Sequence, residues 1–151
     1  MESDPIIEKV TNDNFDEILP LIREYQTFYQ VKEIDDEKNR RYFSQFVNSN
    51  ENGVLHILRY KEKAIGFTTI YNSFSSSRAE TVAVLNDLYV QLQYRGEGFG
   101  KMLVNHAIGE AKNRGYSRLQ WLTSQDNDAA QKLYDGLDAS KSAWFFYAKA
   151  L

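Results

Sequence analysis

The chain has 151 residues, no cysteine and a formal net charge of −3. Without cysteine it can form no disulfide, no thiolate metal site and no cysteine acyl-enzyme. The net negative charge argues against nonspecific nucleic-acid binding, which needs a basic surface. The length predicts one domain, residues 1–151, and the lack of a long apolar run or an apolar leader predicts a cytoplasmic protein without membrane contact.

The first half of the chain shows both strand-like and helix-like patterns of apolar residues. A helix is predicted where apolar residues recur at spacings of three and four from Ile18 to Tyr29, and Pro20 inside this pattern predicts a later start or a kink. The other elements predicted in this half are a strand, a helix and two further strands: Ile6–Val10, Asp36–Val47, Val54–Tyr60 and Ala64–Tyr71.

The second half is built around a nearly continuous apolar strand, Val82–Val90, which is typical of a strand covered on both faces. The longest predicted helix follows at Gly98–Arg114, and Gly115 ends it. A strand, a short helix and a final strand complete the order βααβββαβαβ: Arg118–Thr123, Asp128–Leu137 and Ser142–Lys149.

A glycine-rich turn joins the apolar strand to the longest helix, with Arg95, Gly98 and Gly100 in an R-x-x-G-x-G pattern. A helix start presents unpaired backbone N–H groups and a favourable dipole to an anion, and glycine lets a ligand approach the backbone. The turn has neither the residues of a Walker loop nor the spacing and downstream acid of a dinucleotide site. A different phosphate-bearing ligand is therefore expected.

This turn and the element order resemble the GCN5-related N-acetyltransferase family, whose corresponding turn holds the pyrophosphate of acetyl-CoA. The resemblance covers nearly the whole chain. It implies an α/β (α+β) fold, with about four helices around a central mixed, mostly antiparallel twisted sheet of six to seven strands. It further implies that pantetheine pairs with the central strand, where a backbone N–H polarises the thioester carbonyl. The implied cofactor-binding residues are Leu88, Tyr89, Val90, Arg95, Gly96, Glu97, Gly98, Phe99, Gly100, Lys101, Asn127 and Tyr134.

Two polar residues, Asn86 and Asp87, interrupt the apolar central strand, where an unpaired carboxylate is costly. One interpretation is a bulge or a solvated strand end. The other is that Asp87 holds the acceptor ammonium group or relays its proton, because alkyl amines are mostly protonated at neutral pH. Related polyamine acetyltransferases carry an acidic pair at this place. Asn86 stands here instead of the first acid, which removes one candidate base.

A second signature pairs Asn127 with Tyr134, seven residues apart on a predicted helix and therefore on one face of it. Taken alone, the two residues are an ordinary N-cap and an aromatic core contact. Together with the glycine turn, the resemblance implies that Asn127 bonds the pantetheine amides. It also implies that Tyr134 donates its phenolic proton to the departing thiolate. The expected catalytic residues are Tyr134 and Asp87.

The acceptor is expected to be a small-molecule amine that attacks directly in a ternary complex. Its predicted binding residues are Tyr25, Phe28, Tyr29, Asn86 and Asp87, although the aromatic residues fit a helix core equally well. The chain resembles the yeast histone and D-amino-acid acetyltransferase branch and the polyamine branch, which take different amines. A protein or peptide acceptor and a non-catalytic acyl-CoA-binding module are the alternatives. Residues 136–139 lack the Gly-Phe pair of many relatives, which leaves the shape of the acceptor pocket open.

Metal binding and self-association complete the expectations. His56 and His106 are scattered in the sequence, so no metal site is predicted and acetyl-CoA is the only cofactor expected. The aromatic segment Ser142–Lys149 is consistent with a homodimer contact or with a buried core strand.

Overall fold

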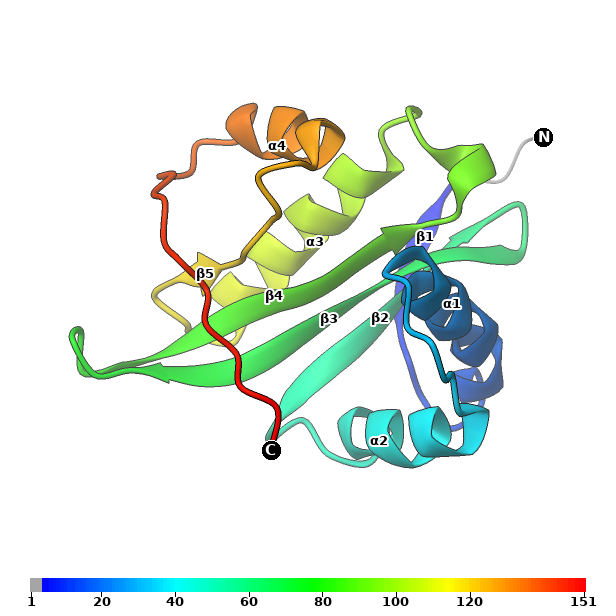
Figure 1. Cartoon of the computed structure of the whole chain (residues 1–151). Coiled ribbons are helices and arrows are strands. Elements are labelled where there is room, and N and C mark those ends of the chain that lie inside the picture. Colours follow the sequence, from blue (N-terminus) through cyan, green and yellow to red (C-terminus); the bar gives the residue numbers. More distant parts are fainter. Residues whose placement is uncertain (1–3) are drawn as a thin grey trace.

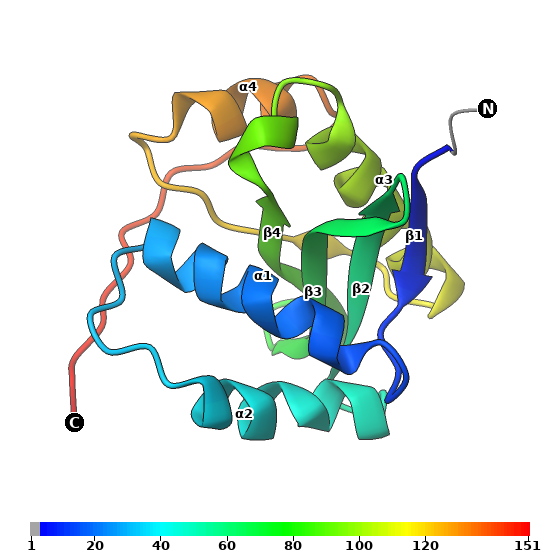
Figure 2. The same cartoon turned by 90° about the vertical axis from the view of Figure 1, so that its right-hand side faces the viewer.

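The computed structural model describes residues 4–151, which form a central sheet with helices on both faces (Figures 1 and 2). Helices α1 and α2 cover one face, and α3 covers the other. The order is βααβββαβα, with a short 3-10 turn, η1, before α3. The elements are β1 (Ile6–Lys9), α1 (Phe15–Phe28), α2 (Asp36–Asn48), β2 (Gly53–Tyr60), β3 (Lys63–Ser75), β4 (Glu80–Val90), η1 (Leu92–Tyr94), α3 (Phe99–Asn113), β5 (Leu119–Gln120) and α4 (Asp128–Asp135).

The five strands lie in the order β1-β2-β3-β4-β5, and the first four are antiparallel to their neighbours. The pairing of β4 with β5 is parallel and short. It consists of Ala83 opposite Leu119 and Val84 opposite Gln120. The predicted class, a mixed and mostly antiparallel sheet with four helices, is confirmed.

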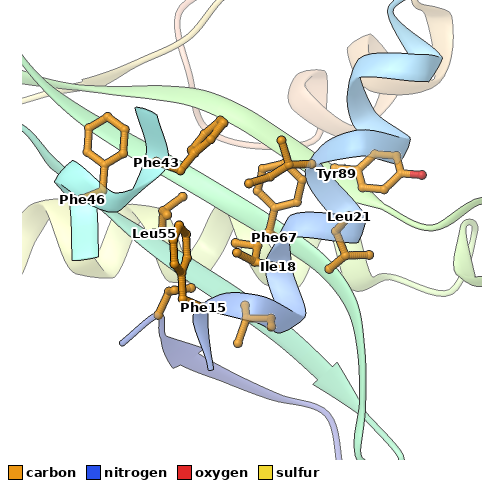
Figure 3. Close-up of a cluster of buried hydrophobic side chains, with 11 residues drawn as sticks. Phe15, Ile18, Leu21, Phe43, Phe46, Leu55, Phe67 and Tyr89 are labelled. Carbon is orange, nitrogen blue, oxygen red and sulfur yellow. The ribbon is translucent and has the colours of Figure 1, made fainter. Parts of the chain in front are cut away.

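The face under α1 and α2 buries the largest apolar cluster (Figure 3). The buried residues of α1 recur at helical spacing. They pack against those side chains of β2, β3 and β4 that point to the α1 face of the sheet. Each fully buried side chain of this size contributes roughly 1.5–3 kcal/mol relative to an exposed one. The cluster holds Val10, Phe15, Ile18, Leu21, Ile22, Phe43, Phe46, Leu55, Ile57, Phe67 and Tyr89.

Helix α1 begins at Phe15 and runs through Pro20, so the expected later start is wrong. Proline lacks the N–H that would bond one turn back. The residues on either side of it, Ile18, Leu21 and Ile22, are almost completely buried, and this packing holds the helix together across the missing bond.

The predicted strand Ser142–Lys149 is not formed, and the sheet has five strands rather than six to seven. Residues 139–151 follow α4 without secondary structure, and in Figure 1 they cross in front of the strands. The side chains from Trp144 to Tyr147 are 80–91% exposed. The physical reason is that β5 ends after Gln120 instead of reaching Thr123, so its edge offers too few main-chain groups to pair with another strand.

Among residues 4–151, no helix is long and apolar enough to cross a lipid bilayer.

Candidate functional site

The edge of β4 that faces β5 is open over its second half. Within the described chain, no strand pairs with this edge beyond Val84. The N–H of Gln91 donates to the carbonyl of Ile65 on the opposite side, in β3. Because main-chain groups of an antiparallel strand alternate in direction, those of Leu88 and Val90 point to the open edge. Main-chain N–H and C=O groups that have no partner strand can form hydrogen bonds with an extended ligand.

The glycine turn places backbone N–H groups beside this open edge. Gly96 has φ 80° and Gly98 φ 89°, a left-handed conformation that other residues adopt only with strain. Gly98 is the N-cap of α3 and offers no side chain to the free N–H groups of the first turn. A Cβ at Gly96 or Gly98 would meet no atom within 4 Å, so both face open space. The turn therefore fits a diphosphate by main-chain N–H groups.

Two residues of this segment use their side chains to hold the turn in place. Phe99 is buried with Leu103 and residues of β2 and β3. The Nε of Arg95 donates to the carbonyl of Val90 at 2.8 Å. The Arg95 guanidinium carbon also lies 4.9 Å from the Phe28 ring centre and 5.5 Å from that of Tyr89. The Arg95 side chain thus connects β4 to the end of α1, while Glu97 and Lys101 are exposed.

Asn86 is the extra residue of a bulge in β4. Thr69 of β3 lies opposite Asp87 and the next residue, Ile70, lies opposite Leu85, so Asn86 has no partner in the register. The interpretation of Asn86-Asp87 as a bulge is confirmed, and the bulge places the Asp87 side chain on the face covered by α1. Asn86 is exposed, and its Nδ2 donates to Asp87 Oδ1 at 3.3 Å.

The Asp87 carboxylate is only 5% exposed, and the structure gives it hydroxyl partners but no ion pair within residues 4–151. Thr69 Oγ1 donates a hydrogen bond to its Oδ2. Burial raises the pKa of Tyr25 far above its usual range, and the nearby Asp87 charge raises it further. The pKa of Tyr71 rises for the same two reasons. The buried Asp87 carboxylate therefore has no positively charged partner within residues 4–151, which is unfavourable for a buried charge.

The predicted acceptor residues of α1 lie at its C-terminal end. The Tyr25 ring lies 4.8 Å from that of Tyr29 and 6.0 Å from that of Tyr89. Phe28 and Tyr29 are more than half exposed. Glu24 accepts a hydrogen bond from the Tyr89 hydroxyl at 3.2 Å and ties α1 to β4. Aromatic faces and carboxylates are therefore grouped on the Asp87 side of the open edge.

Helix α4 brings Asn127 and Tyr134 to the same region from the other side. Asn127 is the N-cap, and its Oδ1 accepts the N–H of Ala130 at 3.1 Å, which leaves its Nδ2 for a ligand. The Tyr134 ring packs 5.4 Å from that of Trp121. Burial raises the Tyr134 pKa, and Tyr29 of α1 raises it further, so the phenol keeps its proton at neutral pH.

Sequence reasoning missed Thr69 and Tyr71, the β3 residues that surround Asp87 together with Tyr25. A signal was present, because Thr68-Thr69 is a polar pair inside an apolar strand, as Asn86-Asp87 is. Two such interruptions in consecutive strands of a hairpin are expected to lie opposite each other. The register confirms this pairing.

The arrangement combines an open strand edge, an anion-binding turn, a buried carboxylate and a protonated phenol. Main-chain N–H groups at the open edge can hold an extended ligand and stabilise a developing oxyanion. The carboxylate can hold an ammonium group, and the phenol can donate a proton. Together these are the requirements for moving an acyl group from a phosphate-bearing donor to an amine.

Comparison with known proteins agrees with this chemistry. Residues 16–138 match the sequence model of the Acetyltransferase (GNAT) family. Over 118 residues, the chain is 31% identical to the N-acetyltransferase YhfO of Bacillus subtilis, with 78% of each chain covered. Over 116 residues, it is 32% identical to the D-amino-acid N-acetyltransferase HPA3 of Saccharomyces cerevisiae, with 76% of this chain and 71% of that one covered. The crystal structure of a probable acetyltransferase superposes with a TM-score of 0.84 at 28% identity, over 97% of both chains.

Proposed function

The chain belongs to the GNAT family of acetyltransferases and is an N-acetyltransferase; on this premise we propose that it acetylates a primary amine by direct attack in a ternary complex. Membership of the family implies acetyl-CoA as the co-substrate. The observation that carries the proposal is the open edge of β4 next to the uncapped start of α3. One ligand with an amide-containing arm and a diphosphate can occupy both.

Each residue of the site has a proposed role in holding the donor. The main-chain groups of Leu88 and the N–H of Val90 pair with the pantetheine amides, since the Val90 carbonyl accepts from Arg95, and Asn127 adds a donor from its Nδ2. The main-chain groups of Tyr89 point to β3 and do not pair with the donor. Tyr89 therefore contributes by spacing the main-chain groups of Leu88 and Val90 along the strand. The turn from Arg95 to Lys101 holds the diphosphate through backbone N–H groups, with the Lys101 side chain adding positive charge.

The reaction itself needs a neutral amine and a proton for the departing thiolate. When bound, acetyl-CoA supplies the activated thioester. Asp87 holds the acceptor ammonium group and relays its proton, which gives the buried carboxylate the cation it lacks. A main-chain N–H of the open edge stabilises the oxyanion, and Tyr134 returns a proton to the thiolate. Because burial raises the Tyr134 pKa, this phenol holds its proton throughout the physiological range.

The proposed acceptor is a small cationic amine, such as an amino acid or a polyamine. Tyr25, Phe28 and Tyr29 surround it, and Asn86 and Asp87 face it from β4. The yeast relative supports the small-molecule class, because its name gives D-amino acids, which are small amines, as what it acetylates. The buried position of Asp87 also favours a slender amine that can reach it.

The test measures coenzyme A binding by calorimetry and thiol release from acetyl-CoA against a panel of small amines and basic peptides. We expect saturable binding and turnover with a small amine. Tyr134→Phe is expected to lower kcat by about 100-fold while the Kd for coenzyme A stays within twofold. Tyr116→Phe, which removes a phenol just beyond the C-terminal end of α3, away from the glycine turn, is the matched control. Unchanged turnover in Tyr134→Phe contradicts the acid role, binding without any turnover identifies a non-catalytic module, and turnover with peptides alone identifies a protein acceptor.

We also propose that the chain forms a homodimer through the segment Ser142–Lys149. Four consecutive aromatic side chains at 80–91% exposure form a patch that monomeric proteins seldom leave in water, and a second copy offers the same patch. Light scattering is expected to give the dimer mass for the native chain and the monomer mass for the double variant Phe145→Ser, Phe146→Ser. The control is Phe74→Ser, which removes an exposed phenylalanine from the β3–β4 hairpin. A native chain that is monomeric at micromolar concentration contradicts the proposal.

A further inference from the structure

The two histidines of the chain, fifty residues apart in the sequence, meet between β2 and α3. The ring centres of His56 and His106 are 4.5 Å apart, and the planes are inclined at 71°. Glu110 lies one turn after His106 on the same face of α3. One ligand atom from each of the three residues lies within 4.8 Å of the others.

Both rings have unsatisfied polar atoms. His56 is 4% exposed, and its Nδ1 is buried without a hydrogen-bond partner. The Nε2 of His106 is also buried without a partner. A neutral imidazole has one donor and one acceptor, and leaving them unpaired in the interior is unfavourable. Apolar side chains of similar volume would pack here without this penalty, so the pair is unexplained by packing alone.

The neighbouring carboxylate is oriented toward the rings. Its Oε1 accepts the Nε of Arg114 at 2.9 Å, and its Oε2 lies 4.0 Å from the Nε2 of His56. Burial raises the pKa of Glu110, but the hydrogen bond from Arg114 and the neighbouring charges together outweigh it and keep the pKa below its usual range. Burial, with a contribution from His106, lowers the pKa of His56 to about 4, so its ring is neutral. Two imidazoles and one carboxylate, with their ligand atoms within 4.8 Å of one another, are a donor set for a transition metal.

We propose that His56, His106 and Glu110 bind a divalent transition-metal ion, with Zn²⁺ the best fit. Zn²⁺ accepts two histidine nitrogens and a carboxylate oxygen in a tetrahedral site, and water takes the fourth position. Bonds of about 2.0–2.2 Å bring the ligand atoms to roughly 3.3 Å from one another, a contraction that side-chain rotation supplies. The Arg114 hydrogen bond to Oε1 orients the carboxylate so that Oε2 is the ligand.

The site has a structural role. His106 lies six residues beyond Gly100, which is about 9 Å along α3, so the ion does not reach the diphosphate end of the helix. It binds β2 to the C-terminal half of α3, where the helix dipole also favours a cation. The ion therefore fixes the position of the helix whose start carries the proposed coenzyme turn. This inference does not depend on the identity of the acceptor or on catalysis.

The test titrates the full chain, freed of metal by chelator and dialysis, with zinc chloride by calorimetry and follows Tm with and without the ion. We expect one ion per chain and a rise in Tm of several degrees, because a ligand that binds only the folded state stabilises it. His106→Gln and Glu110→Gln are each expected to weaken Kd by at least tenfold and to remove most of the Tm shift. His106 is half-buried and Glu110→Gln keeps an acceptor for Arg114, so both variants retain the fold.

Asp13→Asn, which removes an exposed carboxylate from the β1–α1 loop, is the matched control and is expected to bind zinc as the native chain does. Magnesium chloride is a second control, because imidazole ligands disfavour it. The proposal is wrong if the native chain shows neither heat nor a Tm shift with zinc. It is equally wrong if both variants bind zinc with the native affinity.

Discussion

At the scale of single residues, Asp87 shows how the local structure prepares a site. A bulge at Asn86 places a carboxylate on the α1 face of the sheet, where Thr69 donates a hydrogen bond to it and two tyrosines lie close by. These hydroxyl groups keep the carboxylate oriented, yet they supply no positive charge. The folded chain thus carries an electrostatic cost that the proposed cationic substrate would remove on binding.

The first prediction is that Asp87→Asn separates activity from stability. The amide keeps the size of the side chain and an acceptor for Thr69, but it cannot attract an ammonium group. We expect kcat/KM for the amine to fall by at least tenfold, with KM for acetyl-CoA unchanged and Tm unchanged or raised. Asp138→Asn, which alters an exposed carboxylate, is the control. Steady-state kinetics and thermal unfolding measure both effects, and an unchanged kcat/KM for the amine rules out the proposed role of Asp87.

At the scale of elements, α3 carries the site at its start. Its first residue, Phe99, is buried, while the glycine before it is exposed and left-handed. The buried ring fixes the helix in the core, so the free N–H groups are held in place rather than mobile. The sequence pattern predicted this helix within a residue or two at both ends, because periodic apolar residues and the flanking glycines all agree.

The second prediction compares two glycines of this segment. Gly98→Ala is expected to destabilise the chain by about 1 kcal/mol, because its φ of 89° strains any residue with a Cβ. It should also weaken coenzyme A binding, since the added methyl group enters the open space in front of the N–H groups. Gly109→Ala lies in the interior of α3, meets no atom within 4 Å and is expected to stabilise by about 0.5–1 kcal/mol. Urea unfolding and calorimetry measure both, and equal effects of the two changes contradict the argument.

Other features of the elements could not be predicted from the sequence. The aromatic segment Ser142–Lys149 has the composition of a strand, but a strand also needs a partner edge, and β5 is too short to supply one. The meeting of His56 and His106 depends on how β2 packs against α3, and neither residue belongs to a local motif. The positions of the glycine turn and of Asp87 were predictable because each interrupts a regular pattern, whereas Asn127 and Tyr134 were predicted from their seven-residue spacing and the family resemblance. Thr69 and Tyr71 required the strand register.

At the scale of the whole molecule, one arginine connects three elements at the N-terminal edge. Arg59 of β2 forms ion pairs with Glu8 of β1 and with Glu17 of α1, and its side chain is 17% exposed. The hydrogen bond from Arg59 keeps the Glu17 pKa below its usual value of 4.5. Because the pKa is lower in the folded chain, the Glu17 contribution is present above the unfolded pKa and is lost as the pH falls through the folded one.

The third prediction follows from the lowered pKa of Glu17 in the folded chain. Glu17→Gln is expected to lower the free energy of unfolding at pH 7 by a few tenths to about 1 kcal/mol, since Glu17 is nearly half exposed and water screens the pair. The difference from the native chain should shrink below pH 4.5 and disappear once Glu17 is protonated in both states. Urea unfolding at pH 7 and pH 3 measures it, and Asp13→Asn is the control. A gap of the same size at both pH values contradicts the role of the ion pair.

The split between β4 and β5 also determines how fast the solvent reaches the centre of the sheet. The amide of Leu88 lies in the middle of a long strand, yet it points to an edge with no partner, whereas the amide of Tyr89 is bonded to β3. In deuterated water, we expect Leu88 to exchange its amide hydrogen much faster than Tyr89 in the free chain. Saturating coenzyme A should slow the amide exchange of Leu88 to the rate of Tyr89. A single amide, followed by NMR, then reports when a ligand pairs with the open edge of β4.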